Sequence, residues 1–375
     1  MQYRRFGKTE RSLSMFSLGT MRCESAASAQ AVLKAAIAQG INHIETAPAY
    51  GASERYMGQA LSALGTASER QQLTITSKIT PTAPPKDVEQ AVEASLVRLG
   101  VDYLDCLAIH GINTAEHLSQ VQGGMLSAIA ALQQKGLVRH VGFSTHAPLE
   151  VIQAAIATEA FSFINLHYNF FFQHNAPAVA QAHQQDMGIF IISPADKAGR
   201  LYTPPEKLKQ LCHPYEPLLL NYRWLLSDPR VTTLSVGPAT PDELDWPLRM
   251  ADEVGPLRED EQSAIARLEQ SQYATLGTDR CSQCFQCLPC PETINIPEIL
   301  RLRNLAVAYD MEDFGRYRYG MFENAGHWFP GRRGDRCTDC GDCLPRCPES
   351  LNIPALLRDT HTRLKGKGRR RLWGD

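Results

Sequence analysis

The chain has 375 residues, which is enough for one large domain and a smaller one. It carries 38 basic and 40 acidic side chains, so its bulk charge gives no reason to expect nucleic acid or a membrane surface as a partner. The N-terminus lacks the apolar run of a signal peptide, and no stretch has the roughly 20 apolar residues of a membrane-spanning helix. These features predict a soluble, cytoplasmic protein.

Short apolar segments alternate with amphipathic ones between residues 14 and 270. Eight apolar segments, several of them β-branched and bounded by Gly or Pro, predict strands at 15–20, 43–46, 73–79, 103–109, 140–144, 163–168, 189–193 and 232–236. Amphipathic segments between most of them predict helices at 29–39, 54–64, 87–99, 124–134, 149–158, 176–185 and 217–226. Segments 241–250 and 259–270 are interpreted as the last helix and a closing helix. This order favours an α/β chain with a (β/α)₈ TIM barrel over a doubly wound open sheet, because no GxGxxG follows the first strand.

The cysteines are distributed unevenly. Eight of the eleven lie between residues 281 and 347, whereas Cys23, Cys106 and Cys212 are scattered and are interpreted as small buried hydrophobic residues. A secreted disulfide protein would not usually leave its first 280 residues with three isolated cysteines. The two dense groups therefore predict metal sites.

The two cysteine groups belong to an internal repeat, because residues 281–300 and 337–357 match over nearly their whole length. The second copy has the spacing C-x₂-C-x₂-C-x₃-C-P that is typical of bacterial two-cluster ferredoxins, and the first copy is one residue shorter. Three thiolates of one copy hold one cubane, and the fourth ligates the other. We therefore expect two [4Fe–4S] clusters, one held by Cys281, Cys284, Cys287 and Cys347 and the other by Cys337, Cys340, Cys343 and Cys290. Two zinc sites are the alternative, but zinc ribbons usually separate their CxxC pairs by roughly a dozen residues or more.

Unusual polar residues lie where the predicted strands end. Glu45 and Tyr50 follow one apolar strand, Lys78 closes the next, and His110 closes the third. A charged residue that points into a core without a partner is costly. In a barrel, however, these strand ends meet at one mouth, which is where active sites lie.

At this point the first 275 residues resemble the aldo-keto reductase family. The resemblance rests on segments 40–54, 74–79, 102–110, 141–146, 168–169 and 192–199. With the cysteine module, the whole chain is similar to the iron–sulfur-containing branch of that family. The resemblance implies a barrel over 1–275, a ferredoxin-like domain of helices and two clusters over 276–360, and a basic tail over 361–375.

The same resemblance implies a catalytic tetrad. Tyr50 matches the proton donor, Lys78 the lysine and His110 the histidine, whereas Glu45 stands where the family has aspartate. A lysine cation beside a tyrosine favours the phenolate and lowers the pKa of its hydroxyl, and a carboxylate holds the lysine in place. The histidine would orient a substrate carbonyl and share the proton.

A nicotinamide cofactor is a further implication of the resemblance. Ser144, Asn169, Ser193 and Ser235 match cofactor-binding positions, although ordinary hydrogen bonding at strand ends is the competing interpretation for each. The family's Lys and Arg near the last strand are missing from residues 234–244, which leaves NADH, NADPH and neither as alternatives. Lys197 and Arg200 are cations that follow the seventh strand.

These features predict an iron–sulfur oxidoreductase that reduces or oxidises a carbonyl or alcohol substrate with electron transfer through two clusters. A nicotinamide carries a hydride and each cluster one electron, so a flavin in the barrel mouth is not excluded. The alternative function is a non-catalytic electron-transfer or redox-sensing protein with a vestigial barrel. Residues 361–375 hold six Lys or Arg and one Asp, which indicates either a solvated tail or a docking segment for an acidic ferredoxin or flavodoxin.

Overall fold

The computed structural model describes residues 1–64 and 67–367. These residues form two compact units, which we describe separately. The first unit comprises Met1–Pro194 and Asn221–Pro256, and the second comprises Ala195–Leu220 and the described residues from Leu257 to Lys367. No helix within the described ranges is both long and apolar enough to cross a membrane.

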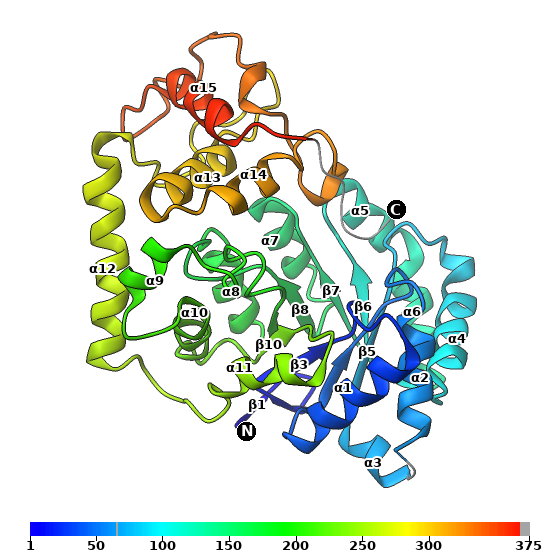
Figure 1. Ribbon diagram of the computed structural model, residues 1–375. Coiled ribbons are helices and arrows are strands. Elements are labelled where there is room, and N and C mark those ends of the chain that lie inside the picture. Colours follow the sequence, from blue (N-terminus) through cyan, green and yellow to red (C-terminus); the bar gives the residue numbers. More distant parts are fainter. Residues whose placement is uncertain (65–66, 368–375) are drawn as a thin grey trace. The chain divides into compact units, whose positions relative to one another are not determined.

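The first unit contains a closed barrel of eight parallel strands (Figure 1). In chain order these are β3 (Phe16–Gly19), β4 (His43–Glu45), β5 (Thr74–Ile79), β6 (Leu104–His110), β7 (Val138–Ser144), β8 (Phe163–Leu166), β9 (Gly188–Ile191) and β10 (Thr233–Val236). The barrel is closed because β10 pairs with β9 on one side and with β3 on the other. All eight predicted strands are present, and the predicted α/β class with a TIM barrel is confirmed.

Helices follow the strands around this barrel. They are α1 (Ala26–Ala38), α2 (Ser53–Ser62), α3 (Ala67–Gln72), α4 (Val88–Leu99), α5 (Ala115–Gln120), α6 (Leu126–Gln134), α7 (Leu149–Ala157), α8 (Ala176–Gln184) and α11 (Asp245–Leu248), while α10 (Pro217–Leu226) crosses the boundary between the units. The helix predicted at 241–250 is a 3₁₀ turn, Pro241–Leu244, followed by the four-residue α11. The helix predicted from 124 begins at Leu126, because Gly124 has a φ of 126° that no helix accommodates.

An antiparallel hairpin precedes the barrel, and the sequence pattern did not predict it. It consists of β1 (Tyr3–Arg5) and β2 (Ser12–Ser14). Phe6, which follows β1, is fully buried, and its ring lies 5.3 Å from that of Phe163 at the start of β8. Gly188 at the start of β9 is needed here, because a Cβ atom would come within 2.2 Å of the Phe6 ring. Phe6 therefore fills the barrel at the amino ends of its strands.

A polar layer lies inside the barrel around His43 of β4. The Nδ1 atom of His43 is 2.7 Å from the Ser17 hydroxyl, and its Nε2 atom is 2.8 Å from the Thr76 hydroxyl. Burial, together with the nearby Lys78 and Arg11 cations, lowers the pKa of His43 to about 3. The imidazole is therefore neutral in the folded barrel.

The His43→Gln variant is expected to lose less of its free energy of unfolding than the parent chain does when the pH falls. The unfolded chain binds a proton at this position near its ordinary pKa of 6.5, and the folded chain binds it only near pH 3, so stability is lost as the pH falls below 6.5. A glutamine can keep both hydroxyl contacts without titrating. The slope of unfolding free energy against pH should fall by about 1.4 kcal/mol per pH unit in this window, which urea unfolding at several pH values measures. An unchanged slope would show that His43 does not contribute to the acid sensitivity.

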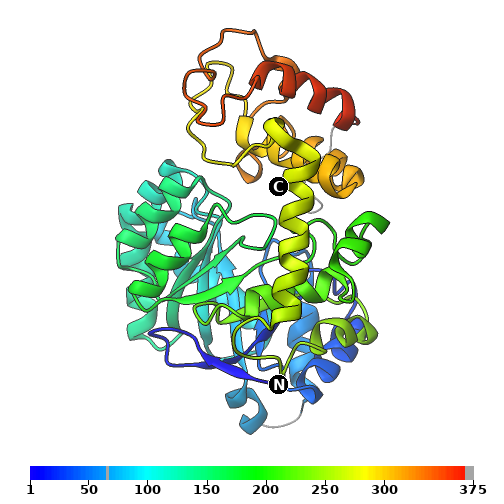
Figure 2. The ribbon, with the colours of Figure 1, turned by 90° about the vertical axis from the view of Figure 1, so that its left-hand side faces the viewer.

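The second unit is helical. Its helices are α9 (Glu206–Cys212), α12 (Glu259–Leu276), α13 (Ile296–Tyr309), α14 (Glu312–Tyr319) and α15 (Ile353–Leu364), and Figure 2 shows α12 along its length. Residues 195–220 and 257–275 lie in this unit, whereas the sequence-based boundary had placed them in the barrel. Hydrogen bonds explain the difference: Arg267 of α12 donates to the Leu211 carbonyl at 3.1 Å, and the Tyr309 hydroxyl donates to the Leu268 carbonyl at 2.8 Å.

Candidate active site and cluster-binding pockets

Three neighbouring strands and one turn supply the predicted tetrad. Glu45 ends β4, Lys78 lies near the end of β5, and His110 ends β6. Tyr50 lies in the turn between β4 and α2. Because β4, β5 and β6 pair in parallel, their carboxyl ends lie at the same end of the barrel.

Lys78 is the centre of this group. Its ammonium donates to the Tyr50 hydroxyl at 2.7 Å, forms an ion pair with the Glu45 carboxylate, and lies 3.3 Å from the Thr46 carbonyl. An ammonium has three donors, and these three acceptors match that number. The Lys78 residue is only 3% exposed, so the fit offsets the cost of burying a cation.

The charge state of Lys78 follows from these contacts. Burial by itself would lower the pKa of Lys78, but the Glu45 carboxylate and the contact with the Tyr50 oxygen outweigh burial and raise the pKa above its ordinary value. Lys78 therefore remains a cation at neutral pH. A cation at 2.7 Å from the Tyr50 oxygen stabilises negative charge that develops on that oxygen.

His110 contacts the ring of Tyr50. The two ring centroids are 5.7 Å apart, and the rings meet edge to face at 89°. Glu45 and Lys78 are buried, whereas Tyr50 and His110 are partly exposed. Tyr50 and His110 are thus the two members of the tetrad that a substrate in the barrel mouth can contact.

The turn that carries Tyr50 is fixed by a buried ionic network at the start of α2. Glu54, 1% exposed, accepts hydrogen bonds from the Ser77 hydroxyl at 2.5 Å and from Arg98 at 2.6 Å. Ser77 is the neighbour of Lys78 in β5. Because the same strand holds Lys78 and anchors α2, the positions of Tyr50 and Lys78 are coupled.

Asn165 belongs to the site, and sequence reasoning missed it. Its side-chain amide on β8 lies 3.5 Å from the Glu45 carboxylate, and its Oδ1 atom is buried without a hydrogen-bond partner among the described residues. An asparagine inside the apolar run at 163–166 was the available signal, since a buried amide without an obvious partner needs an explanation.

The four predicted cofactor residues also lie at the carboxyl ends of their strands. Ser144 ends β7, Asn169 and Ser193 follow β8 and β9, and Ser235 is the third residue of β10. The Ser144 hydroxyl accepts the Gly111 N–H at 3.0 Å, and the Asn169 side-chain carbonyl accepts the Phe171 N–H at 3.0 Å. The hydrogen bonding at strand ends that competed with the cofactor interpretation is therefore present at these two residues.

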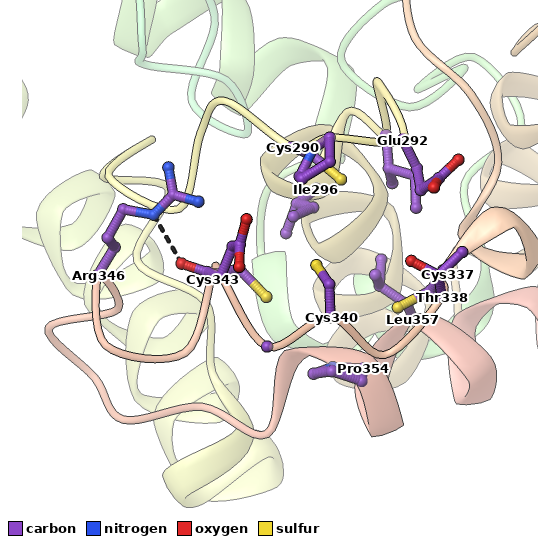
Figure 3. Close-up of a pocket in the computed structure, with 14 residues that line it drawn as sticks. Cys290, Glu292, Ile296, Cys337, Thr338, Cys340, Cys343, Arg346, Pro354 and Leu357 are labelled. Atoms are coloured by element: carbon purple, nitrogen blue, oxygen red, sulfur yellow. Dashed lines mark hydrogen bonds between the residues drawn. The ribbon is translucent and has the colours of Figure 1, made fainter.

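The eight clustered cysteines line two pockets in the second unit. One pocket, of about 340 Å³ including space open to solvent, is lined by Cys290 from the first repeat and by Cys337, Cys340 and Cys343 from the second. Figure 3 shows the sulfur atoms of these four residues around a common space. The other pocket, of about 300 Å³ on the same measure, is lined by Cys281, Cys284, Cys287 and Cys347. The fourth cysteine of each repeat thus lies with the first three of the other repeat.

The pocket walls fit a buried inorganic group. Isoleucine, leucine and proline side chains at the starts of α13 and α15 line both pockets. The two helices begin alike, because Asn295 and Asn352 each cap the helix by accepting a backbone N–H three residues later. The missing residue in the first repeat does not prevent Cys290 from reaching the shared pocket.

Burial makes two of the cysteine thiols harder to deprotonate. Burial raises the pKa of Cys281 to about 11 and that of Cys287 to about 12, and the neighbouring cysteines add to both shifts. A cluster would therefore displace protons when it binds. Within the described ranges, no group of three or more Cys, His, Asp or Glu residues is arranged to hold a single metal ion.

The barrel with a polar constellation at its carboxyl end defines the class of TIM-barrel enzymes. A model of the aldo/keto reductase family matches residues 16–270, and a model of the 4Fe-4S dicluster domain matches residues 280–351. The chain belongs to the aldo/keto reductase family, and a 4Fe-4S dicluster domain follows its barrel.

Individual relatives agree with this assignment. The chain is 30% identical over 241 residues to aldo-keto reductase family 1 member A1 of Rattus norvegicus, a match that covers 57% of this chain and 68% of the relative. It is 31% identical over 138 residues to pyridoxine 4-dehydrogenase of Escherichia coli, covering 33% of this chain and 46% of that protein. The holo structure of an aldo-keto reductase from Bacillus halodurans has the same fold, with a TM-score of 0.62, 21% identity, and coverage of 71% and 96%.

Proposed function

We propose that the barrel interconverts a carbonyl and an alcohol, and that the dicluster unit relays electrons for this reaction. The contact between the Lys78 ammonium and the Tyr50 hydroxyl, at 2.7 Å, is the observation that carries the proposal. A tyrosine is a poor acid at neutral pH unless its conjugate base is stabilised. A buried, paired cation in direct contact provides that stabilisation.

The four residues have separate tasks in this reaction. The Tyr50 hydroxyl delivers a proton to the oxygen of a substrate carbonyl as negative charge develops there. Lys78 stabilises the phenolate that remains, Glu45 holds Lys78 in place, and His110, whose ring contacts that of Tyr50, orients the carbonyl. A bound nicotinamide would supply the hydride, and Ser144, Asn169, Ser193 and Ser235 are proposed to hold it.

The two cysteine pockets are proposed to hold two [4Fe–4S] clusters. Each pocket brings together four thiol groups, with the fourth contributed by the opposite repeat, as the two-cluster spacing requires. Each cluster supplies one electron at a time. Because a nicotinamide transfers two electrons together as a hydride and each cluster takes one, a flavin in the barrel mouth is the candidate for the group that would link the two kinds of transfer.

The nicotinamide part of this proposal is tested by an anaerobic titration of the full chain with NADH and, separately, NADPH. We expect saturable binding, measured by calorimetry, followed by bleaching of the cluster absorbance, because reduced clusters absorb less visible light. Binding without bleaching would show that the nucleotide binds but does not reduce the clusters, so that its reaction would be confined to the barrel. If neither nucleotide binds, the nicotinamide assignment fails and the flavin becomes the leading candidate.

An acidic electron carrier such as a ferredoxin or flavodoxin is the proposed redox partner. The proposed docking segment is the basic tail, of which residues 368–375 lie outside the described residues. Removing residues 363–371 should weaken association with such a carrier and flatten its dependence on salt concentration. Unchanged association at every salt concentration would reject the tail as a docking segment.

A further inference from the structure

A buried guanidinium on α14 lacks an ionic partner. Arg318 is 7% exposed, and none of the described residues forms an ion pair with it. Its contacts are the Met321 sulfur at 3.4 Å and the face of the Phe329 ring, 4.1 Å from the Arg318 Cζ atom to the ring centroid. The Nε atom of Arg318 is buried without a hydrogen-bond partner in the described part of the chain. A thioether and an aromatic ring hold the group in place but do not neutralise it.

A second guanidinium, that of Arg200, lies near the same tyrosine, Tyr317, as Arg318 does. Arg200 lies in the segment that follows β9 and belongs to the same unit as α14. Its Cζ atom stacks 3.9 Å from the centroid of the Tyr317 ring, and Asp196, Arg200 and Arg318 all lie within electrostatic range of Tyr317. The Arg200 Nε atom is also buried without a hydrogen-bond partner among the residues described, because the Asp196 oxygen at 3.9 Å is too distant.

The carboxylates around Arg318 are already paired with other arginines. Glu298, Arg301 and Asp196 lie within electrostatic range of Arg318. Glu298 is occupied by Arg301, which donates to both of its oxygens at 2.8 and 2.6 Å. Asp196 is the remaining carboxylate of the group, and Tyr202 donates to it at 3.2 Å. Asp196 and Glu298 each pair with another arginine, Arg200 and Arg301 respectively, so neither carboxylate is left for Arg318.

We propose that Arg200 and Arg318 form a binding site for an oxyanion, a phosphate or carboxylate group of a small ligand. The proposal goes beyond the carbonyl reaction, and only its nucleotide-phosphate arm rests on the nicotinamide binding of the proposed function. A planar guanidinium presents paired N–H donors that match such a group, and one oxyanion would supply both the missing charge and the missing acceptors. Arg200 and Tyr202 provide the exposed side of the site, since about a third of the Arg200 side chain and 55% of Tyr202 are accessible.

The test is calorimetric titration of the full chain with inorganic phosphate at low salt. Arg318→Gln and Arg200→Gln should each weaken phosphate binding by about tenfold or more, since each removes charged hydrogen bonds. Arg316→Gln is the matched control, because Arg316 lies on the same helix, is exposed, and already pairs with Glu312 at 2.6 Å. It should change binding by less than about twofold. Failure of phosphate and acetate alike to bind, or an equal effect of Arg316→Gln, would overturn the proposal.

Two further arms distinguish the source of the oxyanion. If Arg318→Gln weakens binding of phosphate and of NADPH alike, the site takes a nucleotide phosphate. If it weakens phosphate but leaves NADPH binding unchanged, the site takes a free or substrate phosphate. If acetate binds and phosphate does not, and Arg318→Gln removes acetate binding, the site takes a carboxylate.

A second variant separates binding from folding. Arg318→Met keeps the length of the side chain and removes a buried charge that has no ionic partner. Without phosphate, it should melt at the same temperature as the parent chain or higher. It should also lose the rise in melting temperature that phosphate gives the parent. A marked fall in melting temperature without phosphate would show that an internal partner neutralises Arg318, and the proposal would be wrong.

Discussion

Replacing Tyr50 by Phe is expected to lower the turnover of a carbonyl substrate by about 10²- to 10⁴-fold, because the variant keeps the ring and loses the proton donor. The ring contacts with His110 and with Lys78 would remain, so substrate binding should change little. The measurement is kcat under anaerobic conditions, with a panel of aldehydes and ketones and the nucleotide that binds.

Tyr3→Phe is the matched control for this variant. The Tyr3 hydroxyl donates to the Gly40 carbonyl at 2.8 Å, and the residue lies on β1, outside the barrel sheet. The Tyr3→Phe variant loses a phenol oxygen, as Tyr50→Phe does, but keeps every residue of the tetrad. Its kcat should therefore stay within about twofold of that of the parent chain. If Tyr50→Phe also left kcat unchanged, the barrel would not use Tyr50 as a proton donor. The alternative of an electron-transfer protein with a vestigial barrel would then be favoured.

The second large effect is expected at the cysteine pockets. Cys347→Ala should lower the iron content of anaerobically prepared protein from about eight atoms per chain to about four, since one of two cubanes loses a ligand. Cys281→Ala removes a ligand from the same pocket but from the other repeat, so it should abolish the same cluster signal in the electron paramagnetic resonance spectrum. Cys343→Ala, from the same repeat as Cys347 but the other pocket, should abolish the other signal.

Cys212→Ala is the control, because Cys212 is buried in α9 and lines neither pocket. It should retain all of the iron. If Cys347→Ala and Cys343→Ala abolished the same signal, each repeat would hold its own cluster and the crossed ligand sets would be wrong.

The strands could be predicted because the same pattern of apolar residues recurs at each of them. Each barrel strand is a short apolar run bounded by turn residues, and a charged or polar residue lies at or next to the last position of β4, β5 and β6, where an apolar residue would otherwise be expected. The cysteine repeat was also recognisable, since the spacing of its second copy is typical of bacterial two-cluster ferredoxins. Both signals are local in the sequence.

The rest depended on contacts between distant segments. Phe6 gives no sign in the sequence that it fills the amino end of the barrel, where it meets Phe163 and Gly188. Residues 195–220 have the composition of a barrel loop, and their place with α12 rests on hydrogen bonds such as that from Arg267 to Leu211. Arg318 looks like one of several surface arginines in the sequence, and only the fold shows that it is buried. Neither periodicity nor spacing encodes such pairings.

The most direct measurement is the iron, acid-labile sulfide and zinc content of protein purified without oxygen, together with its spectrum after dithionite reduction. The chain should contain about eight iron and eight sulfide, and the reduced protein should give the magnetic signals of two interacting cubanes. Material that holds about two zinc and no sulfide would contradict the account, because zinc has no redox chemistry with which to carry electrons to or from the barrel.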